Sequence, residues 1–136
     1  MIIIEYDNSK GVSMETLKII KALGDENRLR IVNILFGREL CVCEVEGILS
    51  MTQSNISRHL SKLTSSGVTK YRKDAKYIYY SLEEKTLVVH PFIAEAIKDF
   101  RGEERYMEDL VKLNRYVEHG YTCDDVKDNV LLFLNR

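Results

Sequence analysis

Residues 39–63 have the sequence ELCVCEVEGILSMTQSNISRHLSKL, and this stretch predicts two short helices joined by a tight turn. In each half, apolar residues recur at the spacing of an amphipathic helix. They are Val45, Ile48 and Leu49 in the first half, and Ile56, Leu60 and Leu63 in the second. Thr52 is a suitable N-cap for the second helix, because its hydroxyl can accept a hydrogen bond from the first turn. The order helix, turn, helix is that of a helix-turn-helix motif.

The outward face of the second helix carries side chains that are unusual on a solvated helix. Such a face normally favours Glu and Lys, which have better helix propensities than Ser and Asn. Short donors and acceptors, together with arginine, are the groups that reach base edges and phosphates in the major groove of DNA. We therefore predict contact with double-stranded DNA, the alternative being a plain polar surface. The predicted contact residues are Gln53, Ser54, Asn55, Ser57, Arg58, His59 and Lys62.

A basic β-hairpin is predicted after this helix. Residues 68–73 and 76–82 are rich in β-branched and aromatic side chains that alternate with a period of two, and Asp74-Ala75 separates them. The hairpin is expected to form a wing along the backbone phosphates of DNA, where it adds affinity rather than sequence information. The cations predicted to make these contacts are Arg72, Lys73 and Lys76.

The distribution of charge agrees with a surface that faces DNA. The net charge of the chain is −1, which by itself gives no indication of nucleic acid. No acidic residue, however, lies between Glu46 and Asp74. A surface that faces phosphates needs such an exclusion of acids. The alternative is a basic loop that arose by chance.

Further helices are predicted on both sides of the motif. Helices are expected at residues 13–23 and 25–36 before it, capped by Ser13 and Asp25, and at residues 86–100, 103–119 and 122–134 after the hairpin, the last capped by Thr122. Because Pro91 is tolerated only in a first turn, the regular part of the helix at residues 86–100 is expected to begin nearer His90. The predicted fold class is mainly α with a β-hairpin wing, a winged helix-turn-helix. We assign residues 1–100 to the DNA-binding domain, and residues 101–136 to a helical C-terminal extension of the same domain.

Length and composition indicate a cytoplasmic protein with reduced thiols. A chain of 136 residues fits one domain. Residues 1–7 lack the basic region of a signal peptide, and no stretch approaches the roughly 18 apolar residues of a membrane span. No membrane partner is therefore expected. The number of cysteines is odd, which argues against a disulfide framework.

The pair Cys41 and Cys43 lies at the predicted start of the first helix of the motif and is flanked by glutamates. In a regular helix, residues i and i+2 point about 200° apart. One ion can therefore bind both thiols only where the backbone is extended or distorted. Because this helix supports the DNA-reading helix, an ion that favours a different conformation must weaken DNA binding. The alternative is that these cysteines are small buried hydrophobic residues.

Four stretches of the sequence resemble the ArsR/SmtB family of metal-responsive repressors. ELCVCEV at residues 39–45 resembles the metal box of that family, ELCVCDL, and residues 53–63 resemble its recognition helix. YIYYSL at residues 77–82 resembles the end of its wing, and residues 22–31 resemble its opening segment. The resemblance covers roughly residues 17–100.

This resemblance implies a transcriptional repressor and not an enzyme. It implies a homodimer built through the first helix and the helix near residues 86–100. It also implies a double-stranded operator with twofold symmetry, next to the genes that are controlled.

The identity of the inducing ion is less directly indicated. Thiolates favour soft ions: As(III), Sb(III), Cd(II), Pb(II), Bi(III) and Zn(II). The resemblance implies a third cysteine in the box of arsenic-responsive members, but Glu46 stands there. It implies cysteines in an N-terminal arm of cadmium- and lead-responsive members, and histidine and carboxylate pairs after the wing of zinc sensors. Here no cysteine precedes Cys41, and His90 is the only histidine in the helix predicted directly after the wing.

We therefore predict that Cys123, in the C-terminal extension, joins Cys41 and Cys43 in a three-sulfur site. It would either fold back or reach across the dimer. Three thiolates suit the pyramidal preference of As(III), whose lone pair fills the fourth direction, so As(III) or Sb(III) is the predicted inducer. Cd(II), Pb(II) and Zn(II) remain alternatives, as does a two-cysteine site completed by solvent or a small thiol.

Two rival functions are considered. In the first, Cys41 and Cys43 oxidise instead of binding an ion, although a Cys-x-Cys disulfide closes a small and strained ring. In the second, the chain is a thiol-dependent enzyme or an arsenic-binding chaperone with no role on DNA. The acid-free stretch argues against the second rival, and no cysteine–histidine or carboxylate pair suggests catalysis.

Overall fold

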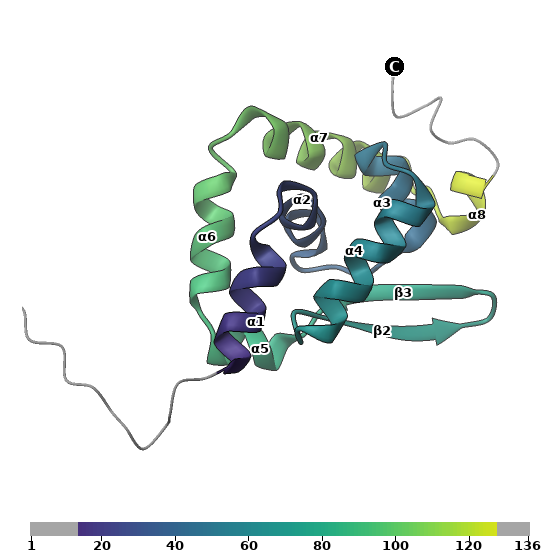
Figure 1. The fold of residues 1–136 in the computed structure, drawn as a ribbon. Helices are drawn as coiled ribbons and strands as arrows, with labels where there is room; N and C mark the ends of the chain where they lie inside the picture. The colour runs from purple at the N-terminus through teal and green to yellow at the C-terminus, as the bar shows by residue number, and fades with distance from the viewer. Residues whose placement is uncertain (1–13, 128–136) are drawn as a thin grey trace, which may run out of the picture.

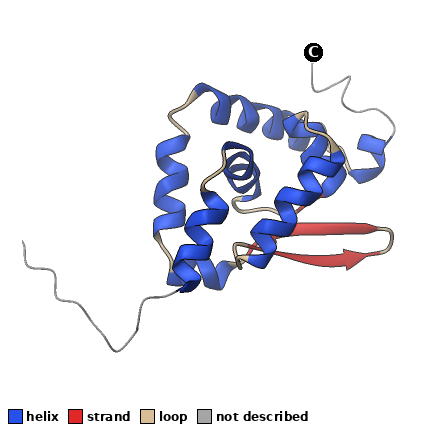
Figure 2. Ribbon diagram, viewed as in Figure 1, coloured by secondary structure: helices blue, strands red, loops and turns tan. Residues whose placement is uncertain are grey.

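The computed structural model describes residues 14–127, which form a helical body with one small antiparallel sheet (Figures 1 and 2). The hairpin formed by β2 and β3 projects beyond the helices, so the predicted mainly α fold with a wing is confirmed. The elements are α1 (Met14–Leu23), α2 (Glu26–Leu35), β1 (Leu40–Cys41), α3 (Val42–Leu49), α4 (Gln53–Ser65), β2 (Thr69–Asp74), β3 (Tyr77–Leu82), α5 (Glu84–Val89), α6 (Phe92–Phe100), α7 (Glu104–Glu118) and α8 (Cys123–Lys127).

Helix α2 lies at the centre of the body, and α1, α4, α6 and α7 pack around it (Figure 1). Its consecutive residues Ile31 and Val32 are both 0% exposed, because neighbouring helices cover it on several sides. Asp25 caps its first turn, where Oδ1 accepts hydrogen bonds from the backbone nitrogens of Asn27 at 2.9 Å and Arg28 at 3.0 Å. The helix is thus both capped as predicted and buried on more faces than an ordinary surface helix.

The sheet has the strand order β1-β3-β2, and all of its pairs are antiparallel. The first helix of the motif was expected to begin at residue 39, but this prediction is wrong, because α3 begins only at Val42 and β1 precedes it. Leu40 and Cys41 instead pair with Tyr80 and Tyr79 of β3. The reason is tertiary, since backbone hydrogen bonds to the wing replace those of a first helical turn.

Two further helices differ from the predicted segments. The single helix expected at residues 86–100 is divided into α5 and α6 around Pro91, which lacks the backbone N–H that a continuous helix needs. Of the helix expected at residues 122–134, the structure describes α8, and residues 128–134 lie outside the described residues.

Helix α7 of the C-terminal extension is joined to α2 by buried polar contacts. Arg30 Nε and Nη2 donate to Asp109 Oδ2 and Oδ1 at 2.8 and 2.9 Å, and the two residues are only 8% and 2% exposed. Arg30 Nη2 also donates to the carbonyl of Leu49 at 3.2 Å. One turn further along α2, Asn33 Nδ2 donates to the carbonyl of Tyr106 at 3.2 Å. These contacts place α7 in the same core as the helix-turn-helix.

Replacing Asp109 by Ala is expected to lower the free energy of unfolding by about 3–5 kcal/mol, because Arg30 would remain buried without its counter-charge. Urea unfolding followed by circular dichroism measures this loss. Glu95→Ala is the control, because Glu95 forms an exposed ion pair with Lys98 at 3.3 Å and should cost less than about 1 kcal/mol. Equal losses in the two variants would contradict the role given to the buried pair.

Candidate functional site

Helix α4 presents its polar residues to solvent and its apolar stripe to the core. Ile56, Leu60 and Leu63 are each 0% exposed. Thr52 caps the helix, and its hydroxyl accepts from the backbone nitrogen of Asn55 at 3.4 Å. The exposed residues of the predicted DNA-contact set on this helix are Gln53, Ser54, Asn55, Ser57, Arg58 and Lys62.

His59 is the exception within that set, since its predicted exposure is wrong. It is 5% exposed, and its Nδ1 lies 3.3 Å from Nη1 of Arg28 in α2. Burial lowers the pKa of His59 below its usual value. His59 lies next to the buried stripe of α4, and its imidazole points toward α2. It therefore contributes to the packing of α4 on α2.

The wing carries its three predicted cations on exposed positions, but two of them have acidic partners. Arg72 Nε donates to Glu39 Oε2 at 2.8 Å, and its guanidinium lies 4.7 Å from the centre of the Tyr79 ring. Lys76 Nζ lies 3.7 Å from Asp124 of α8. These partners could not be predicted from local sequence, because Glu39 lies directly before β1 and Asp124 lies in the C-terminal extension.

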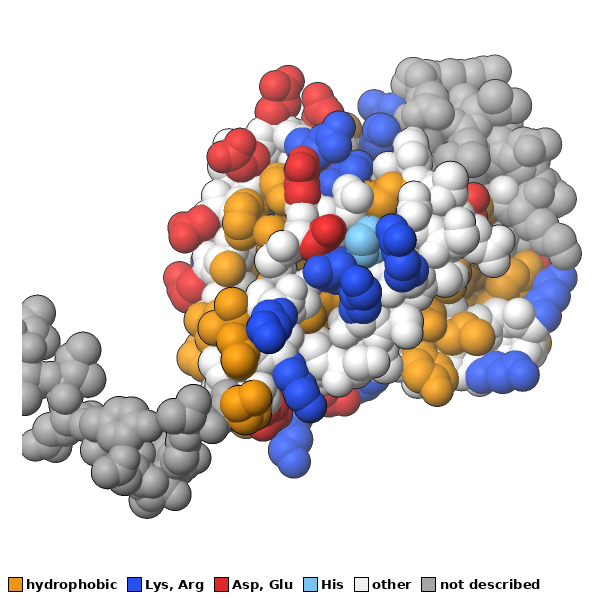
Figure 3. All heavy atoms as spheres, viewed as in Figure 1, with side chains coloured by type: hydrophobic (Ala, Val, Ile, Leu, Met, Phe, Trp, Pro, Cys, Tyr) orange, Lys and Arg blue, Asp and Glu red, His pale blue; other side chains and the backbone are white. Residues whose placement is uncertain are grey.

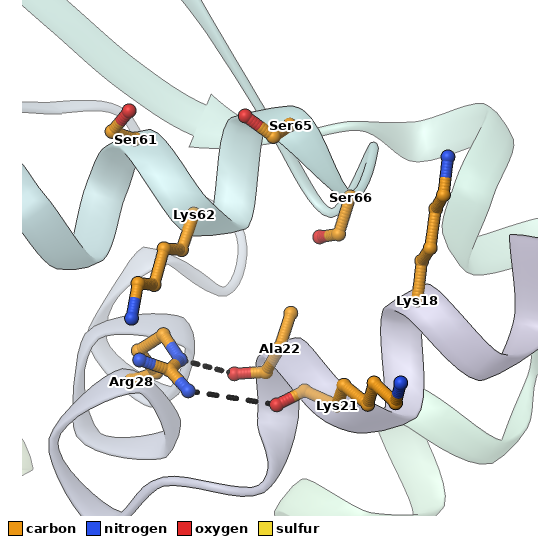
Figure 4. Close-up of a pocket in the computed structure, with 8 residues that line it drawn as sticks. All are labelled: Lys18, Lys21, Ala22, Arg28, Ser61, Lys62, Ser65 and Ser66. Carbon is orange, nitrogen blue, oxygen red and sulfur yellow. Dashed lines mark hydrogen bonds between the residues drawn. The ribbon is translucent and has the colours of Figure 1, made fainter.

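Three further cations, on α1 and α2, lie beside the predicted contact residue Lys62 and were not predicted from the sequence. Lys18 and Lys21 of α1, Arg28 of α2 and Lys62 of α4 line an open pocket of about 460 Å³ (Figure 4). The remaining lining residues are Ala22, Ser61, Ser65 and Ser66. Arg28 donates to the carbonyls of Lys21 and Ala22, which holds the end of α1 against α2. The α1 lysines precede the acid-free stretch by many residues, so only the packing of α1 on α4 reveals this surface.

Charge is segregated on the face of the molecule shown in Figure 3. Lys and Arg side chains gather over α1 and α4, whereas many Asp and Glu side chains lie along the side formed by α6 and α7 (Figure 3). Such a separation orients a protein in the field of a polyanion.

The three cysteines meet at the start of α3. Cys41 is the N-cap residue, and its Sγ lies 3.4 Å from Sγ of Cys43 in the first turn. Cys123 begins α8, which packs on α3, and Cys41 and Cys123 are only 1% and 4% exposed. The predicted approach of Cys123 to the pair therefore occurs within one chain.

The expectation that all three thiols are unpaired is wrong in this structure. Cys41 and Cys123 form a disulfide with a Cα–Cα distance of 6.8 Å, and Cys43 is free. The docking of α8 on α3 provides this partner, which was not evident from an odd number of cysteines. The pairing also differs from the Cys41–Cys43 oxidation considered above. Ion binding by these sulfurs requires the reduced state, because thiolates are the ligands.

Glu44 is a further member of the cluster. It is 7% exposed, and its Oε1 accepts from the backbone nitrogen of Cys41 at 2.9 Å. The hydroxyl of Tyr116 in α7 donates to its Oε2, and Cys123 Sγ lies 3.3 Å from Oε1. Burial, together with the contact with Glu44, raises the pKa of Tyr116, and burial raises the pKa of Cys43. The sequence reasoning treated Glu44 only as a residue that flanks the cysteines.

A helix-turn-helix whose second helix has an exposed polar face, followed by a basic wing, defines the class: a winged helix-turn-helix DNA-binding regulator. A family profile described as "Bacterial regulatory protein, arsR family" matches residues 25–71. The Staphylococcus aureus "Cadmium resistance transcriptional regulatory protein CadC homolog" is 40% identical over 91 residues, which is 64% of this chain and 75% of that protein. The chain belongs to the ArsR family of transcriptional repressors, which are DNA-binding regulators and not enzymes, as predicted.

Other relatives agree with this assignment. The Escherichia coli "Arsenical resistance operon repressor" is 43% identical over 67 residues, which is 48% of this chain and 57% of that protein. The structure of HlyU from Vibrio cholerae matches with a TM-score of 0.55 at 28% identity, and covers 68% of this chain and 94% of that chain. The homodimeric winged helix-turn-helix domain Mb0332 from Mycobacterium bovis matches with a TM-score of 0.58 at 20% identity, covering 73% of this chain and 92% of that chain. The last similarity concerns the fold alone.

Among the described residues 14–127, no helix has the length and apolar character needed to cross a bilayer.

Proposed function

We propose that this chain is a cytoplasmic homodimeric repressor that leaves its operator when Cys41, Cys43 and Cys123 bind As(III) or Sb(III). The observation that carries the proposal is that Cys41, at the start of α3, has the sulfurs of both Cys43 and Cys123 beside its own. Helix α3 packs directly on α4, the helix whose exposed polar side chains are proposed to contact DNA. The soft sulfur donors fit a soft ion, and their number fits the three bonds of As(III).

The proposed DNA contacts have two classes. Gln53, Ser54, Asn55, Ser57 and Arg58 on α4 would reach base edges or nearby phosphates. Lys62, Arg72, Lys73 and Lys76 would contact phosphates, and Lys18 and Lys21 of the basic pocket would extend this contact onto α1 (Figure 4). The serines that line the pocket add further donors for phosphate oxygens.

The proposed coupling between ion and DNA runs through Cys41. This residue pairs with Tyr79 in β3 of the wing and also caps α3. An ion that draws the three sulfurs together would move the backbone that joins the wing to the helix-turn-helix. If the ion lowers the affinity for the operator by some factor, DNA must lower the affinity for the ion by the same factor.

The choice of As(III) over Cd(II) is the finer part of the proposal. The number of cysteines favours As(III), and the likeness to an arsenical repressor agrees with it. The likeness to a cadmium regulator over a longer alignment keeps Cd(II), Pb(II) and Zn(II) as alternatives.

A thiol-redox repressor is the second candidate function, favoured by the Cys41–Cys123 disulfide. An oxidant such as hydrogen peroxide would take two electrons from the two thiols, forming the S–S bond and water. The ion site would then lose two of its three sulfurs. Both functions use the same junction between α3 and the wing.

The proposed dimer interface is an apolar surface on α1 and α5. On α1, Met14, Leu17 and Ile20 are 63%, 41% and 53% exposed, and on α5, Val88 and Val89 are 79% and 60% exposed. The two helices lie at the same end of the body (Figure 1), where Nε2 of His90, at the end of α5, is 3.8 Å from Oε1 of Glu15 in α1. Adjacent exposed apolar residues of this size mark an interaction surface. Residues 1–100 are proposed as the DNA-binding and dimerisation domain, with residues 101–136 as its helical extension.

Two kinds of loss in binding affinity are expected when the protein is tested on DNA from the region upstream of its gene. Arg58→Ala should cost roughly 1–3 kcal/mol per half-site and reduce discrimination against random DNA. The double variant of Lys18 and Lys21 to Ala should weaken both DNAs alike and reduce the salt slope by about 1 per lost contact. Fluorescence anisotropy across a salt series measures both. Lys98→Ala on α6 is the control, and an unchanged slope in the lysine double variant would remove α1 from the interface.

Replacing Val88 by Asp should convert the dimer to a monomer, because it places a charge in the apolar surface. Light scattering after size exclusion gives the mass directly. Val117→Asp is the matched control, since Val117 is 42% exposed on α7, away from the proposed interface. Dissociation by Val117→Asp alone would place the interface on α7 instead.

Adding As(III) to the reduced repressor bound to DNA should release the wild-type protein from the DNA. The same titration should not release the Cys41→Ser and Cys43→Ser variants. Cys123→Ser should need at least about tenfold more As(III), the scale on which metal sites lose affinity when a supporting group is removed. Thr122→Ser is the neighbouring control. Equal release of Cys123→Ser and wild type would refute the three-cysteine site. Release of wild type by peroxide without As(III), abolished in Cys123→Ser, would instead support the redox function.

A further inference from the structure

The cluster at the start of α3 contains a buried carboxylate with no cationic hydrogen-bond partner among the described residues. Glu44 is 7% exposed, and its partners are the backbone nitrogen of Cys41, the hydroxyl of Tyr116 and the sulfur of Cys123. A carboxylate that is taken out of water normally requires a counter-charge or a metal ion. Its two hydrogen-bond donors, the Cys41 amide and the Tyr116 hydroxyl, are neutral, so neither compensates the negative charge of Glu44.

The geometry points to Glu44 as the oxygen ligand of this site. One donor atom each from Cys41, Glu44 and Cys123 lie within 4.8 Å of one another, and Cys43 Sγ is 3.4 Å from Cys41 Sγ. We propose that Glu44 completes a four-ligand site of three sulfurs and one oxygen for a divalent soft ion such as Cd(II) or Zn(II). This rests on the proposed thiolate site and concerns which ions that site prefers.

The contrast between ions follows from their coordination. Zn(II) is almost always four-coordinate and tetrahedral in closed protein sites, and it accepts a carboxylate oxygen beside sulfur. As(III) forms three bonds and directs its lone pair to the fourth position. A carboxylate in that position therefore favours a divalent ion and contributes nothing to As(III). Glu44 would make the site less selective for As(III) than three cysteines alone.

The structure also holds Glu44 in position for this role. It occupies the third position of α3, where Oε1 accepts from the N-cap nitrogen as in a capping box. Tyr116, 2% exposed, donates to the other oxygen from α7. An ionised carboxylate has about four lone-pair positions, so these two hydrogen bonds leave acceptor capacity for an ion. Tyr116 is therefore a positioning residue for the ligand.

A purely structural role for Glu44 has a different signature. If Glu44 served only to cap α3, its loss would disturb all three sulfurs and would weaken every ion alike. If it is a ligand, its loss would weaken divalent ions and spare As(III). The ratio of the two affinities therefore separates the roles, whereas either affinity alone does not.

The test compares Glu44→Gln with wild type as reduced, full-length protein in the absence of DNA. Gln keeps an acceptor for the Cys41 nitrogen, so α3 retains its cap. Cd(II) affinity is measured by competition with a chelator, using the thiolate-to-metal absorption band, and As(III) affinity is measured on the same samples. Cd(II) affinity should fall at least about tenfold, with As(III) affinity unchanged. The visible spectrum of bound Co(II) should also change, since it reports the ligand set.

Two further variants make the result decisive. Glu46→Gln is the matched control, because it removes a half-buried acid from the same helix and should alter neither affinity. Tyr116→Phe removes only the orienting donor and should weaken Cd(II) several-fold without affecting As(III). This variant also tests the proposal if Glu44→Gln fails to fold.

The outcomes that overturn the proposal are distinct. Equal losses for Cd(II) and As(III) would show that Glu44 is only a cap. No change in either affinity in Glu44→Gln, or in Tyr116→Phe if that is the variant that folds, would show that it takes no part. Wild type that binds neither ion would refute the thiolate site itself, and the ligand role with it.

Discussion

The extended backbone at Cys41 is the constraint on which the rest of the site depends. With φ −82° and ψ 165°, this residue ends β1 and also precedes the first turn of α3. A continuous helix would turn the thiols of Cys41 and Cys43 about 200° apart. The extended residue instead allows a separation of 3.4 Å between the two sulfurs. Because Cys41 also pairs with Tyr79, the sulfur cluster and the wing share one segment of backbone.

A second link between the cluster and the wing is electrostatic. Glu39, directly before β1, receives hydrogen bonds from Arg72 of β2, and this contact lowers the pKa of the Glu39 carboxyl. A movement of β1 would therefore also change the position of a cation that faces the proposed DNA. The pair is exposed, so its own contribution to stability is small, but its position connects a proposed phosphate contact to the proposed thiolate site.

The C-terminal extension contributes to the site because α7 is anchored in the core. Arg30 and Asp109 join α2 to α7, and the chain beyond this anchor carries Tyr116 and Cys123 to the start of α3. The buried carboxylate of Glu44 thus receives contacts from both the helix-turn-helix and the extension. The cluster is assembled from segments that are widely separated along the chain, and its composition depends on how they dock.

The sequence by itself determined the local features of this protein. The spacing of Ile56, Leu60 and Leu63, the acid-free stretch and the alternation in the hairpin predicted α4 and the wing, because these patterns reflect short-range periodicity and charge. Only the tertiary structure decided that His59 is buried, that β1 replaces the first helical turn and that α1 brings Lys18 and Lys21 beside α4. It also decided that Cys123 and Glu44 lie together beside Cys41, since contacts across nearly eighty residues come from helix packing, which no local pattern encodes.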